Sequence, residues 1–206
     1  MLVRLRKSLL VLTPDETEAV AFADWLHAHP GEVFLLREIK GGSATMHSIG
    51  PEEEACRVPL NITSKSPMPL QLISNFAHTP FELDGQDYAS IEGFWQGLKF
   101  EAEADRRRLA ALHGGEAKDG GSSAPKSEAF NYSGERVLTG TWAHWKLMRR
   151  ACTAKFEQNG RAREALLSTA KRPLVHQVRP DSRTIPGVIM ADIWTRIRKR
   201  LLRHDA

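Results

Sequence analysis

The chain has 206 residues, of which 41% are hydrophobic and 26% are charged, and these values fit one soluble globular domain with or without an extension. No apolar run approaches the ~20 residues that cross a bilayer, which excludes a membrane-spanning protein. The formal net charge is +4, and the end of the chain from Trp194 onward carries this excess, so net charge alone is a poor argument for nucleic-acid binding.

The first 55 residues predict a small α/β extension. The apolar run from Leu9 to Leu12 is too short for the core of a signal peptide, which needs roughly 7–15 residues, and it predicts a strand. Thr13 to Glu16 predicts a helix start, with Thr13 as the N-cap, and Pro30-Gly31 ends that helix. Val33 to Leu36 predicts a second strand.

Residues 56–206 predict a second domain of the α+β class, mainly helical with a small β-sheet. Short strands are expected at Val58 to Ile62 and at Gln71 to Ile73. Another is expected at Pro80 to Leu83, which leads into the turn signal Asp84-Gly85. Ser90 then suits the N-cap of a helix from Ile91 to about Leu112.

The remaining elements follow a Gly-, Ser- and Pro-rich segment at residues 113–127, which predicts a flexible loop. Helical patterns cover residues 141–159 and 161–170, and Leu174 to His176 predicts an extended segment. A last helix is expected after Pro186-Gly187. In the first of these helices, the side chains expected to share a core-facing side are Trp142, Trp145, Met148 and Cys152.

The cysteine and histidine spacings predict no metal site. Cys56 and Cys152 form no CxxC pair, and we expect both to be buried free thiols, consistent with a reducing cytoplasm. The histidines show neither HExxH nor a three-ligand spacing. We therefore expect a cytoplasmic protein that uses neither a metal nor another cofactor.

The helix that begins near Ile91 carries the best candidates for chemistry. Glu92, Trp95, Gln96 and Lys99 are spaced i, i+3, i+4 and i+7, so one face presents a carboxylate, an indole, an amide and an ammonium group. A core-facing helix would carry apolar residues at these positions, so this face predicts the wall of a pocket. Glu92 lies close to the positive end of the helix dipole, which favours its ionised form and a role as a general base. The alternative is an ordinary first-turn glutamate paired with Lys99 or another cation.

Neighbouring residues add weaker signals. Trp95 is suited to stacking on a base or to packing in the core. Gly93 and Gly97 each cost roughly 1 kcal/mol in a helix interior relative to alanine, which indicates the close approach of another backbone or of a ligand. Asn75 and Phe76 precede the turn, where Asn75 is suited to bonding a backbone group or a ribose hydroxyl.

These residues resemble the NADAR superfamily (NAD- and ADP-ribose-associated). The pattern Ser-Asn-Phe at residues 74–76, a short strand and turn at 80–85, and Ser90, Glu92, Gln96, Lys99 and Phe100 in register are similar to the motifs of its members. Ala154-Lys155-Phe156 and Leu174-Val175 follow in the expected order. The resemblance covers about residues 58–200 and leaves out the first 55.

The resemblance implies an N-glycosidase that hydrolyses the ribose C1′–N bond. One branch of the family hydrolyses phosphorylated riboflavin-pathway intermediates. The other hydrolyses ADP-ribosylated guanine, reverses that modification and can act as an antitoxin. This chain has His176 at the position of a family glutamate and lacks a Trp-Gly loop near Asp181. We therefore expect the ADP-ribosyl-guanine activity, with an ADP-ribosylated DNA and a cognate ADP-ribosyltransferase toxin as partners.

The resemblance also implies roles for single residues. The family's catalytic glutamate maps onto Glu92, and Asp181 is expected to bind ribose hydroxyls or assist Glu92. Substrate binding is expected from Asn75, Phe76, Trp95, Gln96, Lys99, Arg179 and Arg183. Two other classes remain open: a non-catalytic module that binds ADP-ribose, and a nucleic-acid adaptor that uses the basic C-terminal tail.

Overall fold

The computed structural model describes residues 2–4, 10–12, 34–40, 43–48, 58–125, 127–169 and 172–204. Contacts within the chain separate two compact units, Met1–Ala55 and Cys56–Ala206. In the first unit, strands β1 (Leu2–Arg4) and β2 (Leu10–Leu12) pair antiparallel, as do β3 (Phe34–Lys40) and β4 (Ser43–Ser48). The strands expected in this unit are therefore present, whereas the helix expected from Thr13 to Pro30 lies outside the described residues.

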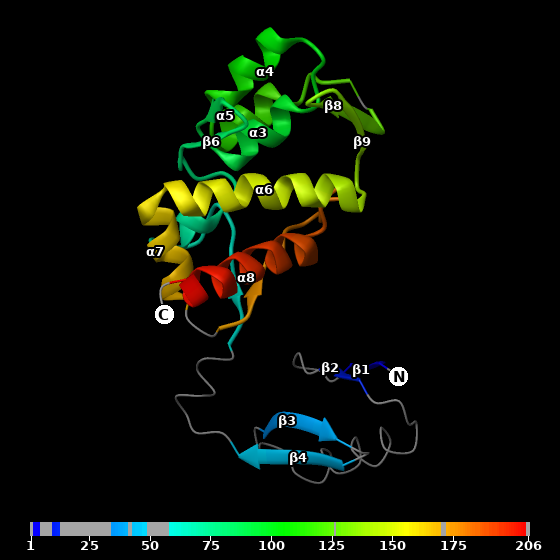
Figure 1. The fold of residues 1–206 in the computed structure, drawn as a ribbon, viewed down its shortest axis with the longest axis vertical. Helices are drawn as coiled ribbons and strands as arrows, with labels where there is room; N and C mark the ends of the chain where they lie inside the picture. The colour runs from blue at the N-terminus through cyan, green and yellow to red at the C-terminus, as the bar shows by residue number, and fades with distance from the viewer. Residues whose placement is uncertain are drawn as a thin grey trace. The chain divides into compact units, whose positions relative to one another are not determined.

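The second unit is built around two long helices (Figure 1). Helices α6 (Trp142–Gln158) and α8 (Gly187–His204) pack against each other, and α7 (Gly160–Ser168) packs on both. On the other side of α6 lie α3 (Ile91–Gly97), α4 (Glu103–Ala110) and α5 (Gly114–Gly120). This mainly helical α+β architecture confirms the predicted fold class.

This unit also contains short two-stranded sheets. Strands β5 (Leu60–Asn61) and β10 (Leu174–Val175) pair in parallel, which joins segments more than 100 residues apart. The hairpin β6 (Phe81–Leu83) and β7 (Gln86–Tyr88) turns at Asp84 and Gly85, both with positive φ, as the Asp-Gly signal predicts. A second hairpin, β8 (Ala129–Tyr132) and β9 (Glu135–Leu138), was not predicted.

The core lies where the faces of these helices meet. Phe94, Phe156, Leu166 and Trp194 are fully or almost fully buried and belong to one apolar cluster. Cys152 is a buried free thiol, as expected, and burial raises its pKa to about 12. Cys56 lies outside the described residues. On α6, Met148 is buried as predicted, but Trp142 is 65% exposed because it occupies the first residue of the helix, beyond the packed region.

Three local predictions were wrong. The helix expected from Ile91 to Leu112 is two helices, because the chain turns after Gly97 and α4 folds back onto α3. Residues 71–73 are part of a 3-10 helix, η1 (Leu70–Ile73), and not of a strand. The segment at 113–127 contains helix α5, which packs on α3.

None of the helices in the described ranges is both long and apolar enough to cross a membrane.

Candidate functional site

Ser90 fixes the start of the helix that carries the candidate site. Its hydroxyl accepts the Gly93 N–H at 2.9 Å and donates to the Leu112 carbonyl at 2.9 Å, so one side chain caps α3 and ties it to the end of α4. The predicted N-cap is confirmed. This start places Glu92 in the first turn of α3, where its backbone N–H donates to the Asn75 carbonyl at 2.9 Å.

Gln96 connects the two charged groups on this helix. Its Nε2 donates to Glu92 Oε1 at 2.7 Å, and its Oε1 accepts a hydrogen bond from Lys99 Nζ. The carboxylate, amide and ammonium groups therefore form one hydrogen-bonded row along α3, which we call the polar row (Glu92, Gln96 and Lys99). Among the described residues, the link between Glu92 and Lys99 therefore runs through Gln96, and the two charges also act on each other's pKa.

The carboxylate and the amide of the polar row are shielded from water, whereas Lys99 is half-buried. Glu92 is 8% exposed and Gln96 is 5% exposed. Burial raises the pKa of the Glu92 carboxyl, while the Gln96 hydrogen bond and the charges of Lys99, Lys118 and His176 oppose that rise. The helix dipole was expected to favour ionisation. The net direction is opposite, because desolvation of a buried carboxylate outweighs its local stabilisation.

Asn75 and Lys155 shape the segment beside Glu92. Lys155 is fully buried in α6, and its Nζ donates to the carbonyls of Ile73 at 3.2 Å and Ser74 at 2.8 Å. Burial lowers the pKa of Lys155 to about 7. Asn75 donates through Nδ2 to Met190 Sδ at 3.7 Å, whereas its buried Oδ1 has no partner among the residues that the structure describes. An unpaired buried acceptor next to the Glu92 backbone is a group that a ligand hydroxyl would satisfy.

Phe76 follows Asn75 in the chain and contacts helix α5. The Lys118 ammonium lies 5.9 Å from the centre of the Phe76 ring, and the Phe76 carbonyl accepts the Gly114 N–H at 3.0 Å. Because Lys118 also acts on the Glu92 carboxyl, α5 adds a second cation to the site. Lys118 was not among the predicted site residues, since its glycine-rich surroundings indicate a loop.

Trp95 forms an aromatic wall next to the polar row. Its ring stacks on His144 at 4.5 Å between centroids and meets Phe130 edge-on at 6.2 Å. His144 is buried and neutral, since burial lowers its pKa to about 4. Its Nδ1 accepts the Gly140 N–H at 3.1 Å, and its Nε2 has no partner within the described ranges. Trp95, Lys99, Phe130 and Thr184 line a cavity of about 310 Å³, a size in the range of small-molecule sites.

The residues of the 179–183 loop lie at the surface. Asp181 is exposed, and its carboxylate accepts the N–H groups of Ser182 at 2.8 Å and of Gly187 at 3.0 Å, which caps the start of α8. Arg179 and Arg183 are exposed, and Arg183 directly precedes the cavity residue Thr184. The structure thus links Glu92 to Gln96 directly, to Lys99 through Gln96 and to the Asn75 backbone, whereas Phe76 contacts Lys118 and Trp95 faces the neighbouring cavity. It shows a capping contact for Asp181, whose catalytic role stays a prediction.

His176 joins the neighbourhood of Glu92 from β10. Its Nδ1 lies 2.7 Å from the Ile62 carbonyl, and because a carbonyl only accepts, Nδ1 carries the hydrogen. Its ring also meets Trp194 edge-on at 5.4 Å. Since His176 acts on the Glu92 carboxyl, the position that departs from the family pattern is next to the candidate catalytic group.

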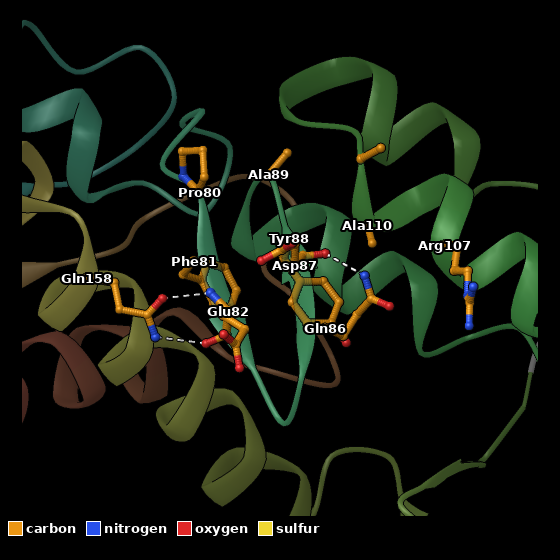
Figure 2. A pocket seen from close by; sticks show the side chains of 11 residues that line it. Pro80, Phe81, Glu82, Gln86, Asp87, Tyr88, Ala89, Arg107, Ala110 and Gln158 are labelled. Atoms are coloured by element: carbon orange, nitrogen blue, oxygen red, sulfur yellow. Dashed lines mark hydrogen bonds between the residues drawn. The ribbon is translucent and has the colours of Figure 1, made fainter.

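A larger cavity has a different lining (Figure 2). It measures about 690 Å³ and is lined by the β6–β7 hairpin, by Arg107 of α4 and by Gln158 of α6. The Gln158 amide pairs with both backbone groups of Glu82, accepting its N–H at 2.7 Å and donating to its carbonyl at 2.9 Å. None of the predicted site residues lines this cavity. We therefore identify the candidate site by the functional groups of its residues and not by the volume of a cavity.

Comparisons with known proteins place the chain among relatives of a described family. A family model described as bacteriophage protein GP30.3 matches residues 68–190. Proteins named N-glycosidase YbiA, from Escherichia coli strain K12 and Shigella boydii serotype 4, are each 31% identical to this chain over 111 residues. That alignment covers 53% of this chain and 64% of each relative, so the chain spans less than two thirds of the length of these curated relatives.

Two further matches extend the comparison. An uncharacterised 17.1 kDa protein from the Gp30-rIII intergenic region of Enterobacteria phage T4 is 36% identical over 69 residues, which are 34% of this chain and 45% of that protein. The NMR structure of Escherichia coli YbiA matches with a TM-score of 0.53 at 26% identity and covers 71% of this chain and 86% of that chain.

Proposed function

The chain belongs to the NADAR superfamily, through the family described as bacteriophage protein GP30.3, and from this membership we propose that residues 56–206 are an N-glycosidase. The substrate we propose is an ADP-ribosylated guanine, in a nucleic acid or a nucleotide, from which the enzyme removes ADP-ribose. The relatives named N-glycosidase support the proposal that an N-glycosidic bond is cleaved. The finer choice of substrate is our own inference.

The observation that carries the proposal is the buried carboxylate of Glu92 in the polar row. Cleavage of the C1′–N bond passes through an oxocarbenium-like state, in which C1′ carries positive charge. The bond's electron pair leaves with the base nitrogen while water adds to C1′. Glu92 takes the proton of that water or stabilises the cation. Because burial raises its pKa, Glu92 is a stronger base once ionised than an exposed glutamate.

Gln96 and Asn75 orient the reaction. The Gln96 amide occupies one oxygen of Glu92 at 2.7 Å, which leaves the other oxygen for water. We assign the unpaired Oδ1 of Asn75 to accept a ribose hydroxyl. We assign the imidazole of His176, which acts on the Glu92 carboxyl, to protonate the departing base.

Cations and rings support a substrate that carries both phosphates and a flat base. Lys99 and Lys118 both act on Glu92, so an anionic group that docks beside the carboxylate meets two ammonium groups. Arg179 and Arg183 are exposed, and we assign them to a second phosphate. The cavity beside Trp95 and Phe130 is suited to the departing base. A substrate with one phosphate and a small ring, such as a riboflavin intermediate, would use fewer of these groups.

The test compares two substrates with the purified full chain. We expect release of ADP-ribose from guanine-ADP-ribosylated DNA and no turnover of the phosphorylated aminopyrimidine intermediate of riboflavin synthesis. Turnover of the pyrimidine alone would replace our substrate with the alternative one. Tight binding of ADP-ribose without turnover of either substrate would make the protein a binding module. An antitoxin role additionally predicts that co-expression protects cells from an ADP-ribosyltransferase toxin that modifies guanine.

Glu92→Gln tests the mechanism itself. We expect kcat to fall ~10²–10⁴-fold, the usual range for loss of a general base. In the unmodified chain kcat should rise with pH through the raised pKa of Glu92, at a pH above the ordinary carboxyl value of 4.5, and the variant should lack this limb. A fully active variant would remove Glu92 from the mechanism.

Thermal unfolding separates lost chemistry from lost fold. Because the folded state raises the pKa of Glu92, its ionisation costs stability as the pH rises through that pKa. Glu92→Gln should therefore unfold at a higher temperature than the unmodified chain at neutral pH, with the difference shrinking as the pH falls. An inactive variant that is also less stable at neutral pH would not support the proposed role.

A further inference from the structure

A basic groove of about 620 Å³ lies between α6 and α8, apart from the polar row. It takes side chains from both helices, which lie side by side in Figure 1. One carboxylate, Asp192, lines it. Its basic members, which we call the groove cations, are Arg149, Arg150, Arg196, Lys199, Arg200 and Arg203.

Half of the groove cations are paired with carboxylates. Arg150 bonds Asp84, Arg196 bonds Asp192 and Arg200 bonds Glu157, at 2.6 to 2.7 Å. Within the described ranges, no ion pair involves the other three, Arg149, Lys199 and Arg203. The groove therefore keeps an excess of positive charge after its internal pairs are formed.

The cations of α8 form a regular row. Arg196, Lys199, Arg200 and Arg203 are spaced i, i+3, i+4 and i+7 and share one face of the helix. Like charges at these spacings destabilise a helix by a few tenths of a kcal/mol per pair. Cations at a helix C-terminus complement its dipole, but this does not explain Arg149 and Arg150, which face the groove from the middle of α6.

The length of the row matches a nucleic-acid strand. Seven residues of α-helix rise about 10 Å, which equals about three phosphate steps of one strand at 3.4 Å of helix axis each. The one apolar residue lining the groove, Ile197, is 3% exposed, so the groove offers no apolar side chain for insertion into a membrane.

We propose that the groove binds the sugar–phosphate backbone of a polynucleotide, so that the glycosidase acts on a base within a strand. The catalytic consequence rests on the proposed function, whereas the binding of a polynucleotide in the groove does not. Helix α8 joins the two sites. Met190 contacts Asn75 at 3.7 Å, and Lys199 follows nine residues later, about 14 Å along the helix. Nine residues are about two and a half helical turns, so Met190 and Lys199 lie on opposite faces of α8, and a strand held in the groove passes around this helix to reach the polar row.

The first experiment measures binding without chemistry. The full chain is titrated into a short, fluorescein-labelled, unmodified single-stranded DNA at several salt concentrations. The triple variant Arg149→Gln, Lys199→Gln, Arg203→Gln should bind at least tenfold more weakly. Its slope of log K against log salt should be smaller in magnitude by about 2, since each phosphate contact on a single strand contributes about 0.7.

The matched control removes the same charge elsewhere. Lys65, Arg107 and Arg161 are exposed and lie outside both the groove and the polar row, so Lys65→Gln, Arg107→Gln, Arg161→Gln should retain binding and slope. Equal losses in both variants would mean that net charge alone drives binding and would overturn the proposal. Binding to phosphatidylcholine–phosphatidylserine vesicles or to a phosphopeptide, without binding to DNA, would also overturn it.

The second experiment separates the groove from the catalytic proposal. The groove variant should hydrolyse ADP-ribosylated guanosine at the rate of the unmodified chain but lose at least tenfold in kcat/KM on the same base within an oligonucleotide. Groove-dependent DNA binding without hydrolysis of either substrate would reject the proposed function and keep the groove. Equal kcat/KM losses on both substrates would reject the groove as a strand site.

Discussion

Gln96 is the residue on which the geometry of the candidate site depends. Its amide donates to Glu92 and accepts from Lys99, so it sets the position of both charged groups. An amide neither gains nor loses a proton near neutral pH, so the row holds its geometry while its ends titrate. The position of Gln96 is in turn fixed by a glycine of a different segment.

Gly121 provides that restraint. A substitution at Gly121 tests the polar row without changing any of its three residues. A Cβ at Gly121 would lie 1.9 Å from Gln96 Oε1 and 2.8 Å from Gln96 Cβ. We expect Gly121→Ala to displace the Gln96 side chain and lower kcat at least ~10-fold, the effect of roughly 1.4 kcal/mol. Steady-state kinetics measure this effect. Gly115→Ala is the control, since nothing lies within 4 Å of its Cβ, and matching kinetics for both variants would contradict the argument.

Part of this site follows from local sequence, because one helix presents it. The spacing of Glu92, Gln96 and Lys99 along α3 is enough to predict that they share a face, and their hydrogen bonds confirm it. Lys118, His144 and His176 come from three other elements, so no local pattern links them to Glu92. The direction in which the pKa of Glu92 shifts was also not predicted, because burial is a property of the assembled fold.

At the scale of elements, the close pairing of α3 with α4 explains the two glycines of α3. A Cβ on Gly93 would lie 2.5 Å from the carbonyl oxygens of both Leu109 and Leu112, and one on Gly97 would lie 3.4 Å from the Arg106 carbonyl. The group that comes close to these two glycines is therefore a neighbouring backbone. The sequence indicates either a backbone or a ligand, and the backbone explanation is confirmed.

Gly93→Ala should accordingly act on stability. The added methyl group meets backbone oxygens that cannot rotate away, and we expect the free energy of unfolding to fall by about 1–3 kcal/mol, the usual cost of overpacking. Chemical denaturation with urea measures this. Gly160→Ala, at a position with nothing within 4 Å, should change it little, and a Gly93→Ala variant as stable as the unmodified chain would refute close packing here.

Element predictions succeeded where a chemical signal was local and failed where packing decides. The Asp84-Gly85 turn, the Ser90 cap and the Pro186-Gly187 helix start each depend on residues within a few positions. The break between α3 and α4 has no proline and no strong turn signal, and it forms because α4 gains contacts by folding back. Helix α5 contains four non-glycine residues within a glycine-rich stretch, and its packing on α3 overrides that low propensity.

At the scale of the whole molecule, a buried cation couples folding to pH. Lys155 has no exposed surface, and its pKa falls to about 7 from the ordinary 10.5. Between these values the unfolded chain binds a proton that the folded chain does not, so this group makes the fold more stable as the pH rises from about 7 toward 10. Below about 7 the full cost of burying the charge is present.

Lys155→Met tests this coupling. The melting temperature of the unmodified chain minus that of the variant should increase as the pH rises from about 7 to about 10. Thermal unfolding monitored by circular dichroism at several pH values gives the two curves. Lys146→Met, an exposed position on the same helix, should show a difference that does not change with pH. Parallel curves for Lys155→Met would mean that Lys155 stays charged in the folded protein.

Every sheet in the described part of the chain has two strands, so each strand has one edge without a partner strand. Unpaired edges invite addition of a strand from another molecule. At Glu82 the Gln158 amide occupies both backbone groups of that edge, as a neighbouring strand would. A single side chain from α6 thus protects the β6–β7 hairpin from self-association, and the length of that helix decides whether the hairpin edge is open to aggregation.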